Sequence, residues 1–268
     1  MNWTYQKITI LGFASTVVMG IVPSVNAQKL PTQLRESVQL AQNQTTAVEL
    51  YNRGVDKIEA GDFQGALADF KQALRLDPND ADTYYNLGYV YHTLGNYDQA
   101  IERYSEAIRI NPNFDQAYSN RGYAYFVLKN YKEAVADASK AIAINSKNDT
   151  AYISRGNAHD ELGEHQLALA DYQKALSINP NNARAYYNRG LTYNRINQHQ
   201  RAGADYSQAI RLKPAFAEAF YNRGLTQFYL NNTAEAIKDL QKAAELFQKQ
   251  GRKENYQSAI DAVSTIGE

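Results

Sequence analysis

The sequence predicts an all-α protein in which short helical hairpins repeat along the chain and stack on one another. Three observations predict this fold. A glycine recurs at one constant spacing, two alanines follow each glycine at fixed distances, and a large apolar or aromatic side chain stands four positions before it. The glycines are Gly54, Gly88, Gly122, Gly156, Gly190 and Gly224. Chance does not place six copies in one register, so the period defines the fold.

Residues 1–27 are predicted to be a secretory signal peptide. Lys7 precedes an apolar run over residues 8–22, and small side chains at Val25 and Ala27 stand before a cleavage site at Gln28. This run is shorter than the roughly 20 apolar residues that span a bilayer. We therefore expect export to the periplasm or the cell exterior, with an uncleaved membrane anchor as the alternative. Residues 28–46 are predicted to be a polar linker, with a weak short helix over residues 32–41 at most.

Each repeating unit is predicted to contain two helices with one break between them. The break falls at a glycine or asparagine in five units, and both residues tolerate the left-handed turn that ends a helix. The turn positions are Gly61, Gly95, Lys129, Gly163, Asn197 and Asn231. Four units close with a proline, which cannot continue a helix. These prolines are Pro78, Pro112, Pro180 and Pro214.

The period, the glycine, the paired alanines, the aromatic residue before the glycine and the closing proline resemble the tetratricopeptide repeat family. The resemblance covers residues 47–250 and implies a right-handed α-α superhelical solenoid of six units: 47–80, 81–114, 115–148, 149–182, 183–216 and 217–250. Ser146 replaces the proline and Ala138 replaces a larger side chain in the third unit, which predicts a looser joint there. Residues 251–268 are predicted to form a capping helix over the last exposed face.

A charge pair recurs inside the units. An arginine directly precedes the glycine, and an aspartate follows at a fixed position of the second helix, in every unit but the second, which has Leu87 and Arg103 instead. We expect the arginine and aspartate of one unit to pair with each other, because pairing across units would set Arg103 against Arg121. The predicted pairs are Arg53 with Asp69, Arg121 with Asp137, Arg155 with Asp171, Arg189 with Asp205, and Arg223 with Asp239.

One stripe of the first helix of each unit is the candidate binding surface, since the resemblance implies that this stripe lines a concave groove. It carries asparagine and tyrosine side chains, which offer hydrogen bonds and contact area to a peptide. Packing between repeats is the alternative role of these tyrosines. The candidate groove residues are Asn52, Asn86, Asn120, Asn188, Asn222, Tyr85, Tyr89, Tyr123, Asn157, Arg184 and Tyr187. His92 is a further expected contact. Local charge comes from Asp160 and Glu161, and from Arg184 and Arg195.

Other kinds of function find little support in the sequence. Basic and acidic residues number 28 each, so nucleic-acid binding is not expected. The chain has no cysteine, and the histidines at positions 159, 165 and 199 occupy aromatic packing positions, so no metal or cofactor is expected. No phosphate-binding loop or catalytic constellation interrupts the repeats. We expect no enzyme and no small-molecule substrate.

The sequence therefore predicts a scaffold that binds a peptide segment of a protein partner in the groove, within an envelope or periplasmic complex. Two alternatives are a self-associating array and, if residues 8–22 are retained, a membrane-anchored accessory factor.

Overall fold

The computed structural model describes residues 31–267, and the predicted signal peptide lies outside them. This part of the chain is helical, and it divides into two compact units with the boundary between Leu128 and Lys129. No helix within it is long and apolar enough to cross a membrane. The all-α fold class is therefore confirmed.

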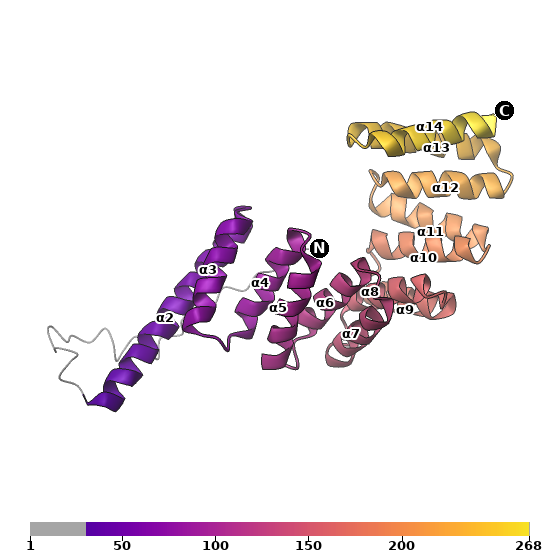
Figure 1. The fold of residues 1–268 in the computed structure, drawn as a ribbon. Helices are drawn as coiled ribbons and strands as arrows, with labels where there is room; N and C mark the ends of the chain where they lie inside the picture. The colour runs from indigo at the N-terminus through magenta and orange to yellow at the C-terminus, as the bar shows by residue number, and fades with distance from the viewer. Residues whose placement is uncertain (1–30, 268) are drawn as a thin grey trace. The chain divides into compact units, whose positions relative to one another are not determined.

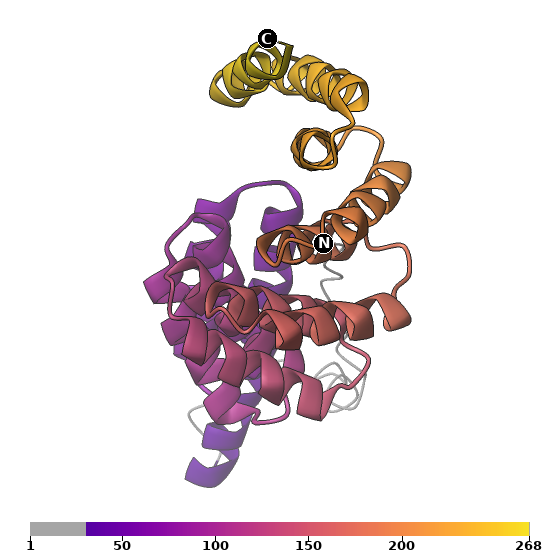
Figure 2. The ribbon, with the colours of Figure 1, turned by 90° about the vertical axis from the view of Figure 1, so that its right-hand side faces the viewer.

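The N-terminal unit contains antiparallel hairpins whose helices pack side by side (Figure 1). Its helices are α2 (Thr32–Glu59), α3 (Phe63–Leu76), α4 (Ala81–Thr93), α5 (Tyr97–Ile110) and α6 (Asp115–Val127). The C-terminal unit is built in the same way, and its last two helices lie against each other in Figure 1 and in Figure 2. Its helices are α7 (Tyr131–Ile144), α8 (Asp149–Glu161), α9 (His165–Ile178), α10 (Ala183–Arg195), α11 (His199–Leu212), α12 (Ala217–Tyr229), α13 (Thr233–Lys249) and α14 (Lys253–Gly267).

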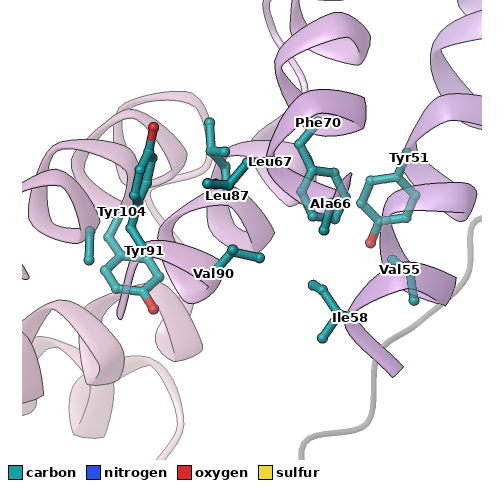
Figure 3. Packing of buried hydrophobic residues seen from close by; sticks show 11 residues of the cluster. Tyr51, Val55, Ile58, Ala66, Leu67, Phe70, Leu87, Val90, Tyr91 and Tyr104 are labelled. Carbon is teal, nitrogen blue, oxygen red and sulfur yellow. The ribbon is translucent and has the colours of Figure 1, made fainter. Parts of the chain in front are cut away.

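The repeat glycine lets the two helices of a hairpin approach each other. A methyl group on Gly54 would lie only 2.6 Å from a ring carbon of Phe70, which is fully buried on the facing helix. Phe70 belongs to the core cluster shown in Figure 3, together with Val55 and Leu87. Bulky side chains therefore fill the space that the small ones leave, as the sequence predicted.

The turn inside each unit has the left-handed backbone that the sequence predicted. Gly61, Gly95 and Gly163 have φ of 79°, 79° and 78°, and Lys129, Asn197 and Asn231 have φ of 63°, 58° and 62°. In a left-handed turn the Cβ atom comes close to the following carbonyl oxygen. Glycine has no Cβ, and asparagine can offset the strain with its short polar side chain, but lysine has neither advantage. The turn at Lys129 therefore costs conformational free energy.

This conformational cost predicts that two substitutions change the stability of the protein in opposite directions. Lys129→Gly removes the unfavourable Cβ, and we expect it to stabilise the protein by up to about 1 kcal/mol, less the entropy that glycine adds to the unfolded chain. Gly95→Ala introduces the same strain without any clash, because no atom lies within 4 Å of the added methyl group. It should lower the melting temperature in a circular dichroism scan. Equal melting temperatures for both variants would contradict the account.

Two regions differ from the sequence-based expectations. The segment before residue 47 is a regular helix continuous with the first repeat, since α2 begins at Thr32. No glycine or proline interrupts residues 32–53, so the helix extends beyond its packed part. At Ser146 the helix ends as in other units: α7 stops at Ile144, and the Asn145 side chain accepts a hydrogen bond from the Lys147 N–H. The expected looser joint is therefore not seen at this helix end.

Candidate functional site

The arginine of the charge pair holds its aspartate with two hydrogen bonds. Arg189 donates from Nε and Nη2 to the two carboxylate oxygens of Asp205, at 2.7 and 2.8 Å. The same bidentate pairing joins Arg53 to Asp69, Arg155 to Asp171, and Arg223 to Asp239. The predicted pairing within a unit is confirmed for these four pairs, while Arg121 and Asp137 belong to different compact units.

Three of these arginines, and Arg121 as well, also reach the preceding repeat, a contact that was not predicted from the sequence. Arg223 Nη1 donates to Ser207 Oγ at 3.0 Å, and Arg121 Nη1 donates to Ser105 Oγ at 2.9 Å. Each acceptor lies on the second helix of the unit before. Arg121, Arg155, Arg189 and Arg223 thus join neighbouring repeats. The hydrogen bond that Arg189 donates to Asp205 raises the pKa of Arg189, and the hydrogen bond from the Arg53 guanidinium lowers the pKa of Asp69.

The predicted groove asparagines take part in a second contact between repeats. Asn86 Nδ2 donates to the Tyr51 hydroxyl at 2.9 Å, and Asn120 Nδ2 donates to the Tyr85 hydroxyl at 3.0 Å. In the C-terminal unit, Asn222 contacts Tyr187 in the same way at 3.0 Å. Burial is the main cause that raises the pKa of Tyr187 to about 12. A ladder of amide and hydroxyl groups therefore holds successive first helices in register.

Asn157 supplies the acceptor for Asn188, because residue 153 is not a tyrosine. Residue 153 is isoleucine, so Asn188 finds no hydroxyl at the usual place. Asn188 Nδ2 donates instead to Asn157 Oδ1 at 2.8 Å, and the Tyr172 hydroxyl donates to the same oxygen at 2.8 Å. The fold thus brings Asn157 and Asn188 together, and they hydrogen-bond to each other.

These contacts change the interpretation of the asparagines. Asn86 and Asn120 are only 3% exposed, so a ligand could not reach them while their hydrogen bonds are intact. Asn52, Asn157, Asn188 and Asn222 are partly exposed, and ligand contact by them remains a prediction. A signal for the structural role was present in the sequence, because each tyrosine and its asparagine stand at the same spacing in successive units.

Disrupting one rung should cost stability. Asn120→Ala leaves the Tyr85 hydroxyl without its donor, and Tyr85→Phe leaves the buried amide without its acceptor. We expect each variant to lose about 1–2 kcal/mol of unfolding free energy. Urea unfolding of both single variants and the double variant forms a cycle. The double variant should lose clearly less than the sum of the single losses, and strict additivity would contradict direct coupling.

The aromatic candidates of the N-terminal unit are largely occupied by packing. The Tyr85 ring lies 4.9 Å from that of Phe114 between centroids. Tyr123 stacks on His92 at 5.2 Å, and burial lowers the pKa of this histidine. Tyr89 is half-buried and packs against the core cluster. Each of these tyrosines remains partly exposed, so ligand contact by them stays a prediction.

The C-terminal unit presents a more open surface, which the sequence analysis missed. We call it the α12 aromatic face; it consists of Tyr221, Leu225, Phe228 and Tyr229. Phe228 is 44% exposed and Tyr229 is 66% exposed. Tyr229 stacks on His199 with the ring centroids 5.0 Å apart and the planes 11° apart. The spacing from Tyr221 by four, seven and eight positions places all four on one side of the helix, a signal that could have identified them.

The expected groove charges largely neutralise one another. Arg195 contacts Asp160 at 2.9 Å and Glu161 at 2.6 Å, so it links α10 to α8. Arg184, at the start of α10, is exposed. His165 Nδ1 lies 2.8 Å from Asp160 Oδ1, and His159 Nδ1 lies 2.5 Å from Glu164 Oε2. Among residues 31–267, no group of three or more histidine, aspartate or glutamate side chains is arranged to hold a metal ion.

Family models match most of the repeating region. The TPR repeat model matches residues 54–95, 91–129 and 156–197, and the tetratricopeptide repeat model matches residues 116–148, 183–216 and 217–250. The chain is a tetratricopeptide repeat protein. This membership supports a protein-interaction scaffold and gives no indication of catalysis. No curated protein sequence matches the chain.

Solved structures resemble the array to different degrees. A crystal structure of MamA is 32% identical, with a TM-score of 0.56, and the match covers 62% of this chain and 96% of MamA. YrrB, a TPR protein with an unusual peptide-binding site, is 26% identical with a TM-score of 0.55, over 72% of this chain and 97% of YrrB. PilW, a type IV pilus biogenesis factor, is 20% identical with a TM-score of 0.72, over 80% of this chain and 98% of PilW. The tetratricopeptide solenoid fold predicted from the sequence is therefore confirmed.

Proposed function

We propose that this tetratricopeptide array binds an apolar segment of a protein partner at the α12 aromatic face and serves as a scaffold for a complex outside the cytoplasm. The observation that carries the proposal is the exposure of Phe228 and Tyr229 side by side. Large aromatic side chains grouped at a surface are typical of interaction sites and often dominate their binding energy.

The surroundings of these aromatic residues favour a peptide ligand. The stacking of Tyr229 on His199 holds its ring in place, so little side-chain entropy is lost on binding. Leu225 and Tyr221 extend the apolar surface along α12, and both are partly exposed. Partly exposed Tyr187 and Leu191 lie at the matching positions of α10. YrrB is likewise a TPR protein with a peptide-binding site, which supports this class of ligand.

The proposed location rests on residues 1–27, which lie outside the described structure. Their layout is that of a secretory signal, and Edman sequencing of the protein from its native cells tests it. A chain that begins at Gln28 supports export, while a chain that retains residues 8–22 supports the membrane-anchored alternative.

Self-association by end-to-end stacking is less well supported. Glu49 and Asp56 are exposed on α2, where the other units have small or apolar residues that are fully buried against their neighbours. A polar outer face is typical of a terminal repeat. A mass that does not change with concentration in sedimentation equilibrium would exclude self-association.

Photo-crosslinking in the native cells tests the binding face. Tyr229 is replaced by the photoreactive residue benzoylphenylalanine, and the crosslinked partner is identified by mass spectrometry. The matched control carries the same residue in place of Leu167, which is 53% exposed on α9 of the same compact unit. A partner captured from position 229 and absent at position 167 supports the proposal. Capture at 167 alone, or at both positions equally, contradicts it.

A double variant then tests the energy of the contact. Phe228→Ala with Tyr229→Ala should weaken binding of the captured partner by roughly 1,000-fold, since hot-spot aromatic residues each contribute about 2 kcal/mol and every 1.4 kcal/mol is about ten-fold in affinity. Helical content should not change, because both side chains are exposed. Leu167→Ala should leave the affinity unchanged.

A further inference from the structure

The second repeat contains a pocket where its charge pair is missing. The pocket has a volume of about 410 Å³ and lies between α3 and the hairpin of α4 and α5. It is lined by Lys71, Leu74, Arg75, Tyr84, Leu87 and Arg103, with Tyr91 at its edge. All of these residues belong to the N-terminal compact unit.

Comparison with the other repeats explains why the lining of this pocket combines apolar and cationic side chains. In four units a guanidinium occupies this place, where it contacts the aspartate of its own unit, and Arg155, Arg189 and Arg223 also reach Ser139, Gln173 and Ser207 of the unit before. At the joint between the first and second units all three positions differ. Leu87 replaces the arginine, Arg103 replaces the aspartate, and Lys71 replaces the serine or glutamine. The guanidinium is absent, and the groups that would hold it have become cations.

The rim of the pocket is positively charged. The Lys71 ammonium lies 5.6 Å above the Tyr91 ring, a cation-π contact. Arg75 is exposed at the next turn of α3. Arg103 contacts Glu102 at 3.0 Å, but this glutamate is 64% exposed and neutralises only one of the three cations. Such an exposed ion pair contributes little to the stability of the protein, so Arg103 can leave Glu102 when a ligand binds.

The floor of the pocket is apolar. Leu74 and the Tyr84 ring are its partly exposed apolar residues. Leu74 packs against the core cluster of Figure 3, to which the buried lining residues Leu87 and Tyr91 belong. Side chains of leucine or phenylalanine match such a floor, and carboxylates match the cations above it.

We propose that this pocket is a second binding site, which takes an acidic peptide segment with an apolar side chain between its carboxylates. The site is separate from the predicted groove. Leu87 and Tyr91 lie about 160° around α4 from Tyr85 and Tyr89, at about 3.6 residues per turn. It therefore does not depend on the function proposed for the α12 aromatic face.

Fluorescence anisotropy with a defined probe tests the site. The probe is a fluorescein-labelled peptide Glu-Asp-Phe-Glu-Leu-Asp-Glu, and the control peptide carries glutamine and asparagine in place of the acids. The full mature chain should bind the acidic peptide at least roughly ten-fold more tightly, because charge-assisted contacts are lost in the control. Added salt should weaken binding of the acidic peptide. Equal affinity for both peptides, or no binding of the acidic peptide up to about 1 mM, overturns the proposal.

A matched variant replaces three lining residues with those that other repeats use. Lys71→Ser, Leu87→Arg and Arg103→Asp together rebuild the arginine clamp, so the variant should fold with unchanged helical content. It should lose at least roughly ten-fold in affinity for the acidic peptide. Arg75→Gln alone, at an exposed position, should give a smaller loss. Phe228→Ala with Tyr229→Ala should leave this affinity unchanged. Wild-type affinity in both the triple variant and Arg75→Gln refutes the site, and tighter binding of a single-stranded oligonucleotide than of the peptide assigns it to a different ligand.

Discussion

Gly190→Ala is expected to unfold at a lower temperature than the wild type, although alanine favours helices. The added methyl group would lie 2.7 Å from Tyr206 Cε1, closer than carbon atoms approach without displacement. Tyr206 is fully buried and cannot move away freely. Overpacking of this kind typically costs about 1–3 kcal/mol, which outweighs the gain of about 1 kcal/mol in helix propensity. Circular dichroism melting measures the difference.

Gly203→Ala is the matched control, and its expected effect has the opposite sign. Gly203 is also buried in a helix of the C-terminal unit, but the nearest atom to its added methyl group is Thr226 Cγ2 at 3.9 Å. This distance is an ordinary contact, so the gain in helix propensity should raise the melting temperature. If Gly190→Ala were as stable as Gly203→Ala, close helix approach would not be the reason for the repeat glycine.

Arg189→Leu is expected to lose about 3 kcal/mol or more of unfolding free energy, because it leaves a buried carboxylate without its partner. The Arg189 and Asp205 side chains are only 15% and 8% exposed, and Arg189 also contacts Gln173. Its guanidinium further lies 5.5 Å from the centroid of the Tyr186 ring. The shift in the midpoint of urea unfolding measures the loss.

Removing both charges should restore much of this stability. In Arg189→Leu with Asp205→Leu no unpaired carboxylate remains, and apolar replacement of a buried ion pair is often close to neutral. The second repeat, which lacks both residues, is a natural precedent. A double variant less stable than Arg189→Leu alone would show that the carboxylate is not the cause of the loss.

The candidate site was only partly predictable. The stripe of first-helix residues stays a prediction as a binding surface, because the sequence does not show which of its side chains use their hydrogen bonds inside the protein. Asn120 is buried by the contact with Tyr85, whereas Tyr229 stays exposed beside His199. Both outcomes depend on how the next repeat packs, which a single helix pattern does not contain.

The sequence by itself determined the period, the family, the left-handed turns and the partners of the charge pairs. Each of these follows from local backbone preference or from the same few residues repeated in one register, so the information lies within one or two units. Only the tertiary structure decided that the arginines also join neighbouring repeats, that the asparagines form a ladder, and that Leu87, Arg103 and Lys71 leave a cationic pocket. These features arise where side chains from different helices compete for the same space and the same hydrogen bonds, and that competition is resolved only when the helices are packed together.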